Sequence, residues 1–365
     1  MAAIEAVSGV CGPVLFLRLL HAKPIRKMKS ILRPKSRSLF LARSLTAIVG
    51  AALICFATAT VVSAQDTPTL LVLRPTPKAK KVDPSTPIAP VVQSDVSEIR
   101  IGGKPVAITS WTPLLKGPTT LQLVVLLDAA QRIGINRQFD DIRKFFDSLP
   151  SNVEIAVGYL LQGKAKVVQP FTTDHALSGN ALSPPSNDGA SSPKGDNGDP
   201  YYCLQDLAVH WPDPDPAKVR AVLVFTDGTV RYNNSGYASQ NNPTVDMAAQ
   251  DLLRAGIAPF TIYHSDRAIA TLPGQIDRKG CPECLDQLAA TTNGQSLYYA
   301  EMGLPAAGSF SPLLYRFYSI LYTEAVVTVT AKGSGLKSLD IKTSRDDIKV
   351  TGPVSVMIGN VLPKK

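Results

Sequence analysis

The chain has 365 residues, of which 45% are hydrophobic, and a formal net charge of +9. Most of that charge lies in residues 1–64, which carry nine Lys or Arg and one Glu, so that 29 basic and 28 acidic residues remain for the rest. A nearly neutral body has no electrostatic reason to bind phosphate backbones, and this balance argues against nucleic acid as a partner.

The first 64 residues have the pattern of a leader. A basic segment that begins at Met28 precedes an apolar stretch over 45–62, and Val62-Ser63-Ala64 ends it before Gln65. A basic flank, an apolar middle and small residues at a cleavage point predict a secretory signal peptide, with Met28 as an alternative start. The same stretch approaches the ~20 residues of a membrane span, so an uncleaved inner-membrane anchor is the alternative. Both interpretations predict an exported body, either periplasmic or extracellular.

Two short segments follow the leader. Residues 65–97 contain six prolines, which predicts a semi-extended linker without regular structure. Residues 98–120 predict a β hairpin, because 98–101 and 105–108 alternate around a Gly102-Gly103 turn.

From residue 121 to 322, apolar runs alternate with amphipathic stretches, which predicts an α/β fold with a doubly wound, mostly parallel sheet. The expected strands cover 121–128, 153–161, 166–171, 221–227, 257–263 and 295–300, and the expected helices cover 136–148, 201–210, 244–255, 284–292 and 311–322. The remaining residues, 323–365, alternate as expected for a short antiparallel β extension.

Two of the buried strands end on an aspartate, Asp128 and Asp227. A carboxylate at the carboxyl end of such a strand points into the crevice where open α/β folds bind ligands. The order, spacing and paired aspartates resemble a von Willebrand factor type A (VWFA) domain, and more narrowly the secreted bacterial "VWFA-related" proteins first grouped from Acidobacteria. That resemblance implies that Asp128 and Asp227 are the first and last ligands of a metal-ion-dependent adhesion site.

The ligand motif itself is degenerate. The family's Asp-x-Ser-x-Ser reads Asp128-Ala129-Ala130-Gln131-Arg132 here, so both hydroxyl positions are lost and one carries a positive charge. The sequence therefore favours a crevice without a cofactor, in which the aspartates pair with Arg132 or cap helices. The alternative is an altered Mg²⁺, Mn²⁺ or Ca²⁺ site in which Asp199 replaces the family's threonine.

Cys281-Pro282-Glu283-Cys284 is the other motif of interest. In an oxidising compartment it predicts a local disulfide, or a bridge from one of the two cysteines to Cys203. A redox pair and half of a zinc site are the alternatives. Three cysteines follow the leader, so one thiol is expected to stay free or to pair between molecules.

These features predict an exported, non-enzymatic interaction module. Its crevice would present Asp128, Arg132, Tyr201, Asp227 and Arg231 to another protein or a cell-surface polymer. No hydrolase elbow, phosphate-binding loop or dinucleotide fingerprint is present, and no catalytic residues are predicted. The alternatives are a divalent-metal-dependent adhesion module and a periplasmic thiol–disulfide protein that uses Cys281 and Cys284. Contact with a membrane is expected only through an uncleaved anchor.

Overall fold

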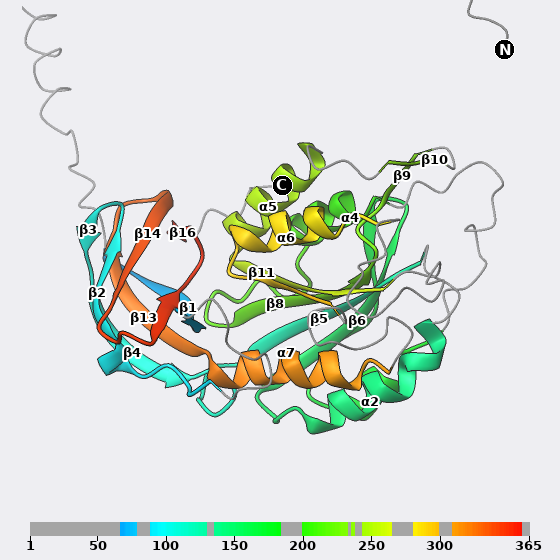
Figure 1. Ribbon diagram of the computed structural model, residues 1–365, viewed down its shortest axis with the longest axis horizontal. Helices are drawn as coiled ribbons and strands as arrows, with labels where there is room; N and C mark the ends of the chain where they lie inside the picture. The colour runs from blue at the N-terminus through cyan, green and yellow to red at the C-terminus, as the bar shows by residue number, and fades with distance from the viewer. Residues whose placement is uncertain are drawn as a thin grey trace, which may run out of the picture. The chain divides into compact units, whose positions relative to one another are not determined.

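The computed structural model describes residues 66–78, 88–129, 135–183, 199–232, 235–237, 243–264, 280–298 and 309–359. All of them belong to the unit Val62–Lys365. The described part of this unit contains one six-stranded sheet with helices on both faces, two smaller four-stranded sheets and one two-stranded sheet (Figure 1). The expected leader, including the apolar stretch over 45–62, lies outside the described residues.

The six-stranded sheet confirms the predicted fold class. Its strand order is β12-β11-β8-β5-β6-β7, and all neighbours are parallel except β6 and β7. Its strands are β5 (Leu121–Asp128), β6 (Val153–Leu161), β7 (Lys164–Thr172), β8 (Val219–Thr226), β11 (Ile257–Tyr263) and β12 (Gln295–Leu297). Every residue of β5 and β8 is buried, as their unbroken apolar runs indicated.

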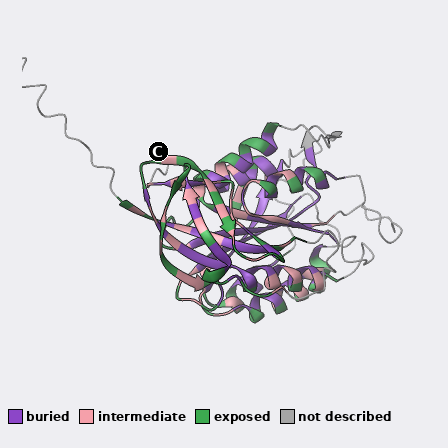
Figure 2. Ribbon diagram, turned by 60° about the vertical axis from the view of Figure 1, so that its left-hand side comes forward, coloured by how far each residue is buried: buried purple, intermediate pink, exposed green. Residues whose placement is uncertain are grey.

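Helices cover both faces of this sheet (Figure 1). One face carries α2 (Phe139–Ser148) and α7 (Ser311–Thr323), and the other carries α4 (Pro200–Val209), α5 (Pro243–Ala255) and α6 (Pro282–Ala290). The short helix α3 (His175–Asn180) occupies a segment that the sequence placed in a loop. The helix faces that meet the sheet are buried and the outer faces are exposed (Figure 2). A separate pair of short strands, β9 (Val230–Tyr232) and β10 (Ser235–Tyr237), is antiparallel.

The predicted element boundaries hold to within a few residues. Residues 135–138 form a 3₁₀ turn before α2, where a longer α-helix was expected. α6 begins two residues earlier than predicted, because Pro282 fits the first turn of a helix, where its missing N–H needs no partner. β12 ends at Leu297, and the rest of the strand predicted over 295–300 is outside the described residues apart from Tyr298.

The two smaller sheets form a module of their own, with strand orders β15-β1-β13-β4 and β16-β14-β2-β3. The predicted hairpin and the predicted C-terminal extension are both present, and they share one apolar core. The strands are β1 (Asp66–Pro77), β2 (Val96–Ile101), β3 (Lys104–Pro105), β4 (Ala107–Pro113), β13 (Ala325–Lys332), β14 (Gly335–Thr343), β15 (Ile348–Thr351) and β16 (Ser355–Ile358). A 3₁₀ turn over Gln93–Asp95 precedes β2.

The prediction of an irregular linker over 65–97 is wrong for its first part. Strand β1 is 12 residues long, and Leu71 and Leu73 are buried in the module's core. Residues 66–73 pair only with β13, and residues 74–77 pair only with β15. Each proline of β1 therefore lies where the strand has a single neighbour, so a missing N–H can face the open side without breaking the ladder. The part of the linker over 79–87 lies outside the described residues.

Strand β1 also joins the module to the α/β domain. Leu71 and Leu73 point into the module's core, whereas Leu70 and Val72 pack against the core beneath the six-stranded sheet. Alternate side chains of one strand therefore serve two cores. The following residue, Arg74, forms a buried ion pair with Glu324 at the end of α7.

Candidate functional site

Two predicted carboxylates lie at the same edge of the six-stranded sheet. β5 and β8 are adjacent and parallel, so Asp128 at the end of β5 and Asp227 just after β8 share the carboxyl edge. Both side chains are buried. Thr226 donates its hydroxyl hydrogen to Asp128 Oδ2 at 2.7 Å, and the Thr229 N–H donates to Asp227 Oδ1 at 2.9 Å. The chain therefore supplies a donor to each carboxylate from the end of β8 and from the turn that follows it.

The third predicted carboxylate, Asp199, caps helix α4. Its Oδ1 accepts hydrogen bonds from the backbone N–H groups of Tyr201 at 2.8 Å and Tyr202 at 3.3 Å. Pro200 occupies the first turn, and Asp199 itself is buried. A carboxylate in this position satisfies the free donors of the helix and complements its dipole. Helix capping was predicted for Asp128 and Asp227, but the structure shows it at Asp199, which the sequence offered only as an alternative metal ligand.

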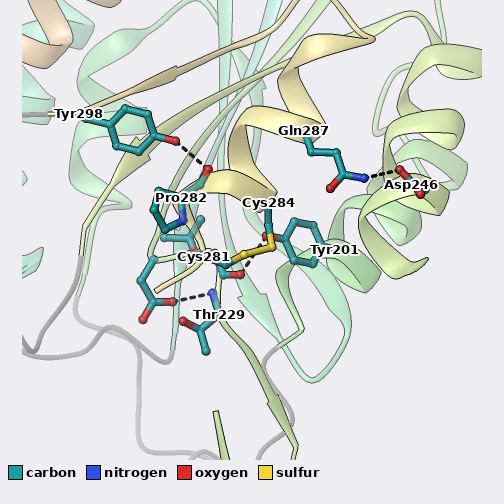
Figure 3. The surroundings of a disulfide bond; sticks show 11 residues. Tyr201, Thr229, Asp246, Cys281, Pro282, Cys284, Gln287 and Tyr298 are labelled. Atoms are coloured by element: carbon teal, nitrogen blue, oxygen red, sulfur yellow. Dashed lines mark hydrogen bonds between the residues drawn. A yellow bond between two sulfur atoms is a disulfide. The ribbon is translucent and has the colours of Figure 1, made fainter. Parts of the chain in front are cut away.

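Tyr201 lies near all three carboxylates. Its side chain is fully buried, and its hydroxyl donates to the Gly228 carbonyl at 2.9 Å (Figure 3). Burial, and then the nearby charges of Asp199, Asp227 and Asp128, raise the pKa of Tyr201 well above its usual range. The phenol is therefore a neutral donor. The prediction that Tyr201 contacts a partner is wrong, because a side chain that packs inside the α4 side of the core cannot reach a partner.

Two of the three cysteines that follow the leader form the predicted local disulfide. Cys281 and Cys284 form a disulfide with a Cα–Cα distance of 5.2 Å at the start of α6 (Figure 3). Cys203 is a buried free thiol, so the alternative bridge from Cys203 is wrong. Burial, with the charge of Asp128 as the next cause, raises the pKa of Cys203 to about 12. A buried, protonated thiol on α4 does not pair between molecules.

Some predicted residues remain without a described side chain. Arg132 and the lost hydroxyl position at Ala130 lie outside the described residues. Only the backbone of Arg231 is described, and it pairs with Gly236 between β9 and β10. Within the described ranges, no helix is long and apolar enough to cross a membrane.

The residues described do not assemble a metal-binding cluster. In this part of the chain, no three His, Cys, Asp or Glu side chains are grouped so that they could hold an ion. Asp199 already accepts two N–H groups of its helix, and the carboxylates of Asp128 and Asp227 each accept a hydrogen bond. A divalent ion would have to share these carboxylates with the chain's own donors.

The segment Thr226-Asp227-Gly228-Thr229 was not predicted to form a structural unit. Gly228 has φ +69°, and a Cβ there would lie 2.8 Å from the Cys281 carbonyl oxygen. The Asp-Gly pair straight after a buried strand was a turn signal that could have revealed it. Tyr202, which is 41% exposed at the start of α4, is a better contact residue than Tyr201.

A pocket of about 210 Å³ lies at the opposite edge, where β8 and β11 begin. It lies between β1, β16 and the end of α5. Two of its cations form ion pairs, Lys218 with Glu154 and Asp213, and Arg254 with Asp251, and Arg220 donates to the carbonyls of Ala255 and Asp215. The pocket is therefore remote from the strand-end carboxylates and offers no unused charge from these two cations.

The topology now decides the kind of domain. A doubly wound sheet with one antiparallel edge strand carries buried aspartates at the carboxyl ends of its two central strands. The domain has a von Willebrand factor type A fold. At the carboxyl edge of this A-type domain, Tyr201 lies near the buried Asp128, Asp199 and Asp227, and the Cys281–Cys284 disulfide lies beside Tyr201 (Figure 3).

Comparisons with known proteins found similar solved structures. No protein-family model and no curated protein matches the chain. Similar solved structures include an aerotolerance-related membrane protein from Bacteroides fragilis NCTC 9343 and BatB from Bacteroides thetaiotaomicron. Each is 16% identical, with 55% of this chain and 98% of the other covered and a TM-score of 0.37. The SpRpn10 VWA domain is 11% identical, with coverages of 54% and 94% and a TM-score of 0.35.

Proposed function

We propose that the chain is an exported, non-enzymatic interaction module whose A-type domain binds another protein or a cell-surface polymer at the strand-end crevice. The observation that carries the proposal is the edge itself: two central strands end there beside buried carboxylates that accept hydrogen bonds from the chain and so support the edge from within. A rigid edge under connecting segments is a common scaffold for recognition. Export is supported by the leader pattern in residues 1–64.

Binding at this crevice is proposed to be independent of metal. The support is chemical: the family's two hydroxyl positions are Ala130 and Arg132, and Asp199 caps α4. The chain's own donors already stabilise all three carboxylates. In the second candidate, adhesion through a divalent ion with altered ligands, the ion would share these carboxylates with the chain's own donors.

A thiol–disulfide activity is the less favoured third candidate. Exchange needs a thiolate to attack one sulfur of the disulfide along the S–S axis, and the attacking group must reach it. Cys281 and Cys284 are each 2% exposed. Their burial favours a structural role for the bond.

Site-specific photo-crosslinking tests this proposal. A photoreactive residue replaces Tyr202 at the crevice edge, and a matched variant carries it at the exposed Lys337 of β14. In the producing cell, we expect a defined adduct from position 202 that persists with EDTA and is missing from position 337. An adduct that EDTA abolishes would favour the metal-dependent candidate. Equal adducts from both positions, or none from position 202, would contradict binding at the crevice.

A further inference from the structure

We propose that the Cys281–Cys284 disulfide is a positioning element of the crevice: it fixes the backbone of Asp227–Thr229, so that only the oxidised protein has a binding-competent edge. The inference deepens the proposed function and rests on it. It assigns a role at the crevice to a bond that lies on α6, a different element from the strands that carry the carboxylates.

The first contact is a direct hydrogen bond between the two segments. The backbone N–H of Cys281 donates to the Asp227 carbonyl oxygen at 2.9 Å. The Cys281 carbonyl in turn accepts the N–H groups of Cys284 at 3.1 Å and Leu285 at 3.3 Å, which forms the first turn of α6. The disulfide closes this same turn, so it limits how far the Cys281 N–H can move from Asp227.

The second contact is steric and involves a glycine on each side. A Cβ on Gly228 would lie 2.8 Å from the Cys281 carbonyl oxygen and 2.9 Å from Leu285 Cγ. A Cβ on Gly280 would lie 2.3 Å from the Asp227 carbonyl oxygen. Two backbones that approach so closely cannot shift independently, and only glycine permits the approach.

Two buried tyrosines contact the segment around Gly228 and the start of α6 (Figure 3). Tyr201 donates to the Gly228 carbonyl at 2.9 Å, and Tyr298 lies within hydrogen-bond distance of the Pro282 carbonyl at 2.9 Å and of Asp286 Oδ1 at 2.8 Å. The disulfide lies between these two rings. It therefore belongs to the layer that supports Asp227, whose Oδ1 accepts the Thr229 N–H.

Reduction removes the constraint. A dithiol transfers two electrons and two protons to the bond, the S–S bond breaks, two thiols form, and the reductant becomes a disulfide. The first turn of α6 then loses its covalent closure next to Asp227. Because both cysteines are buried, the oxidised form is expected to persist once the chain has folded in an oxidising compartment.

Amide hydrogen exchange on the full chain tests the inference without a partner. The samples are the oxidised protein, the protein reduced with dithiothreitol, and the Cys281→Ser/Cys284→Ser variant, with Cys203→Ala as a matched cysteine control. We expect the Cys281 and Thr229 amides to exchange at least about tenfold faster in the reduced and double-serine proteins. The Val327 amide in β13 and all amides of the Cys203→Ala protein outside α4 should keep their rates.

Two outcomes would overturn the inference. Unchanged exchange at Cys281 and Thr229 would mean that the bond does not position the crevice. Faster exchange throughout the protein, including β13, would mean that the bond stabilises the whole fold or that the variant does not fold. Either result would leave the interaction function standing, because photo-crosslinking at position 202 tests that function separately.

Discussion

Replacing Arg74 with alanine should be the most damaging single change at the junction of the two parts of the structure. The Arg74 guanidinium donates to Glu324 Oε1 from Nε at 2.8 Å and from an Nη at 2.5 Å. It also donates to the carbonyls of Asn293 at 2.7 Å and Gly294 at 3.2 Å, and it lies 5.0 Å from the ring of Phe260. One side chain thus joins β1, the end of α7, the segment after α6 and β11.

The expected cost follows from what the substitution leaves behind. Glu324 is 2% exposed, so Arg74→Ala leaves a buried carboxylate without its cation. It also removes the hydrogen-bond donor from the carbonyls of Asn293 and Gly294. Breaking a buried ion pair from one side costs about 3–5 kcal/mol of the free energy of unfolding. Arg254→Ala is the matched control, because Arg254 is 53% exposed and pairs with Asp251 on the surface. Its cost should stay below about 1 kcal/mol.

The penalty should also depend on pH. Burial raises the pKa of Glu324, while the charge and hydrogen bond of Arg74 lower it, and burial is the larger effect. A carboxyl whose folded-state pKa is raised favours the folded state at pH values below its ordinary pKa and destabilises it as the pH rises. Loss of Arg74 raises that pKa further. The penalty of Arg74→Ala should therefore be smaller near about pH 4 than near about pH 7.

Urea unfolding of both variants at the two pH values measures these differences. The double variant Arg74→Met/Glu324→Leu should recover most of the lost stability, because apolar residues can replace a buried ion pair without leaving a charge unpaired. The reasoning is refuted if Arg74→Ala costs no more than Arg254→Ala. A penalty that is the same at both pH values would refute the role of the Glu324 charge.

Three further substitutions probe the site and the core by the same unfolding measurement. Asp199→Ala should lower the free energy of unfolding by about 1–2 kcal/mol. Asp174→Ala removes an exposed cap from the short helix α3 and should lower it by about half as much. Equal losses would contradict the idea that burial strengthens the Asp199 cap. Gly228→Ala should lower the free energy of unfolding more than Gly256→Ala. Both residues have positive φ, but only at Gly228 would the new Cβ lie 2.8 Å from the Cys281 carbonyl oxygen. Equal losses would contradict this close approach. Phe317→Ala should cost about 3–5 kcal/mol, and less than ~1 would contradict its central place between α2 and β11.

The central fold was predictable because local pattern and burial agree there. The apolar runs that became β5 and β8 could only be strands buried on both faces, and each had an aspartate at its end. Those two signals sufficed to place Asp128 and Asp227 at one edge of one sheet. The alternation with helices predicted a doubly wound, mostly parallel sheet, whereas the order of its six strands is known only from the structure.

Strand β1 was not predicted, because its three prolines argue against a strand and its apolar run is short. The short run Thr69-Leu70-Leu71-Val72-Leu73 was too brief to stand against Pro68, Pro75 and Pro77. Only the partner strands show that no ladder bond is needed at those positions. The same limit applies to Arg74 and Glu324, which are 250 residues apart and meet only after both parts of the structure have formed.

The site was harder to predict because burial depends on neighbours. Tyr201 follows a helix cap in the sequence, and nothing local says whether its ring points inward or outward. The sequence allowed Cys281 to pair with Cys284 or with Cys203. The structure decides between them, because Cys203 on α4 is a free thiol buried in the core between the helices and the sheet. The contact between Gly228 and Cys281 joins β8 to α6, so it also required the folded chain.

The most direct test of the metal-independent crevice is thermal unfolding of the purified chain with EDTA and with millimolar Mg²⁺, Mn²⁺ or Ca²⁺, for the natural protein and Asp128→Ala. An ion present at 100 times its dissociation constant would add about 2.7 kcal/mol, which is a shift of several degrees for a domain of this size. We predict that the unfolding midpoint of the natural protein is the same in EDTA and in each ion. A midpoint that rises by several degrees with an ion, and no longer rises in Asp128→Ala, would contradict the account.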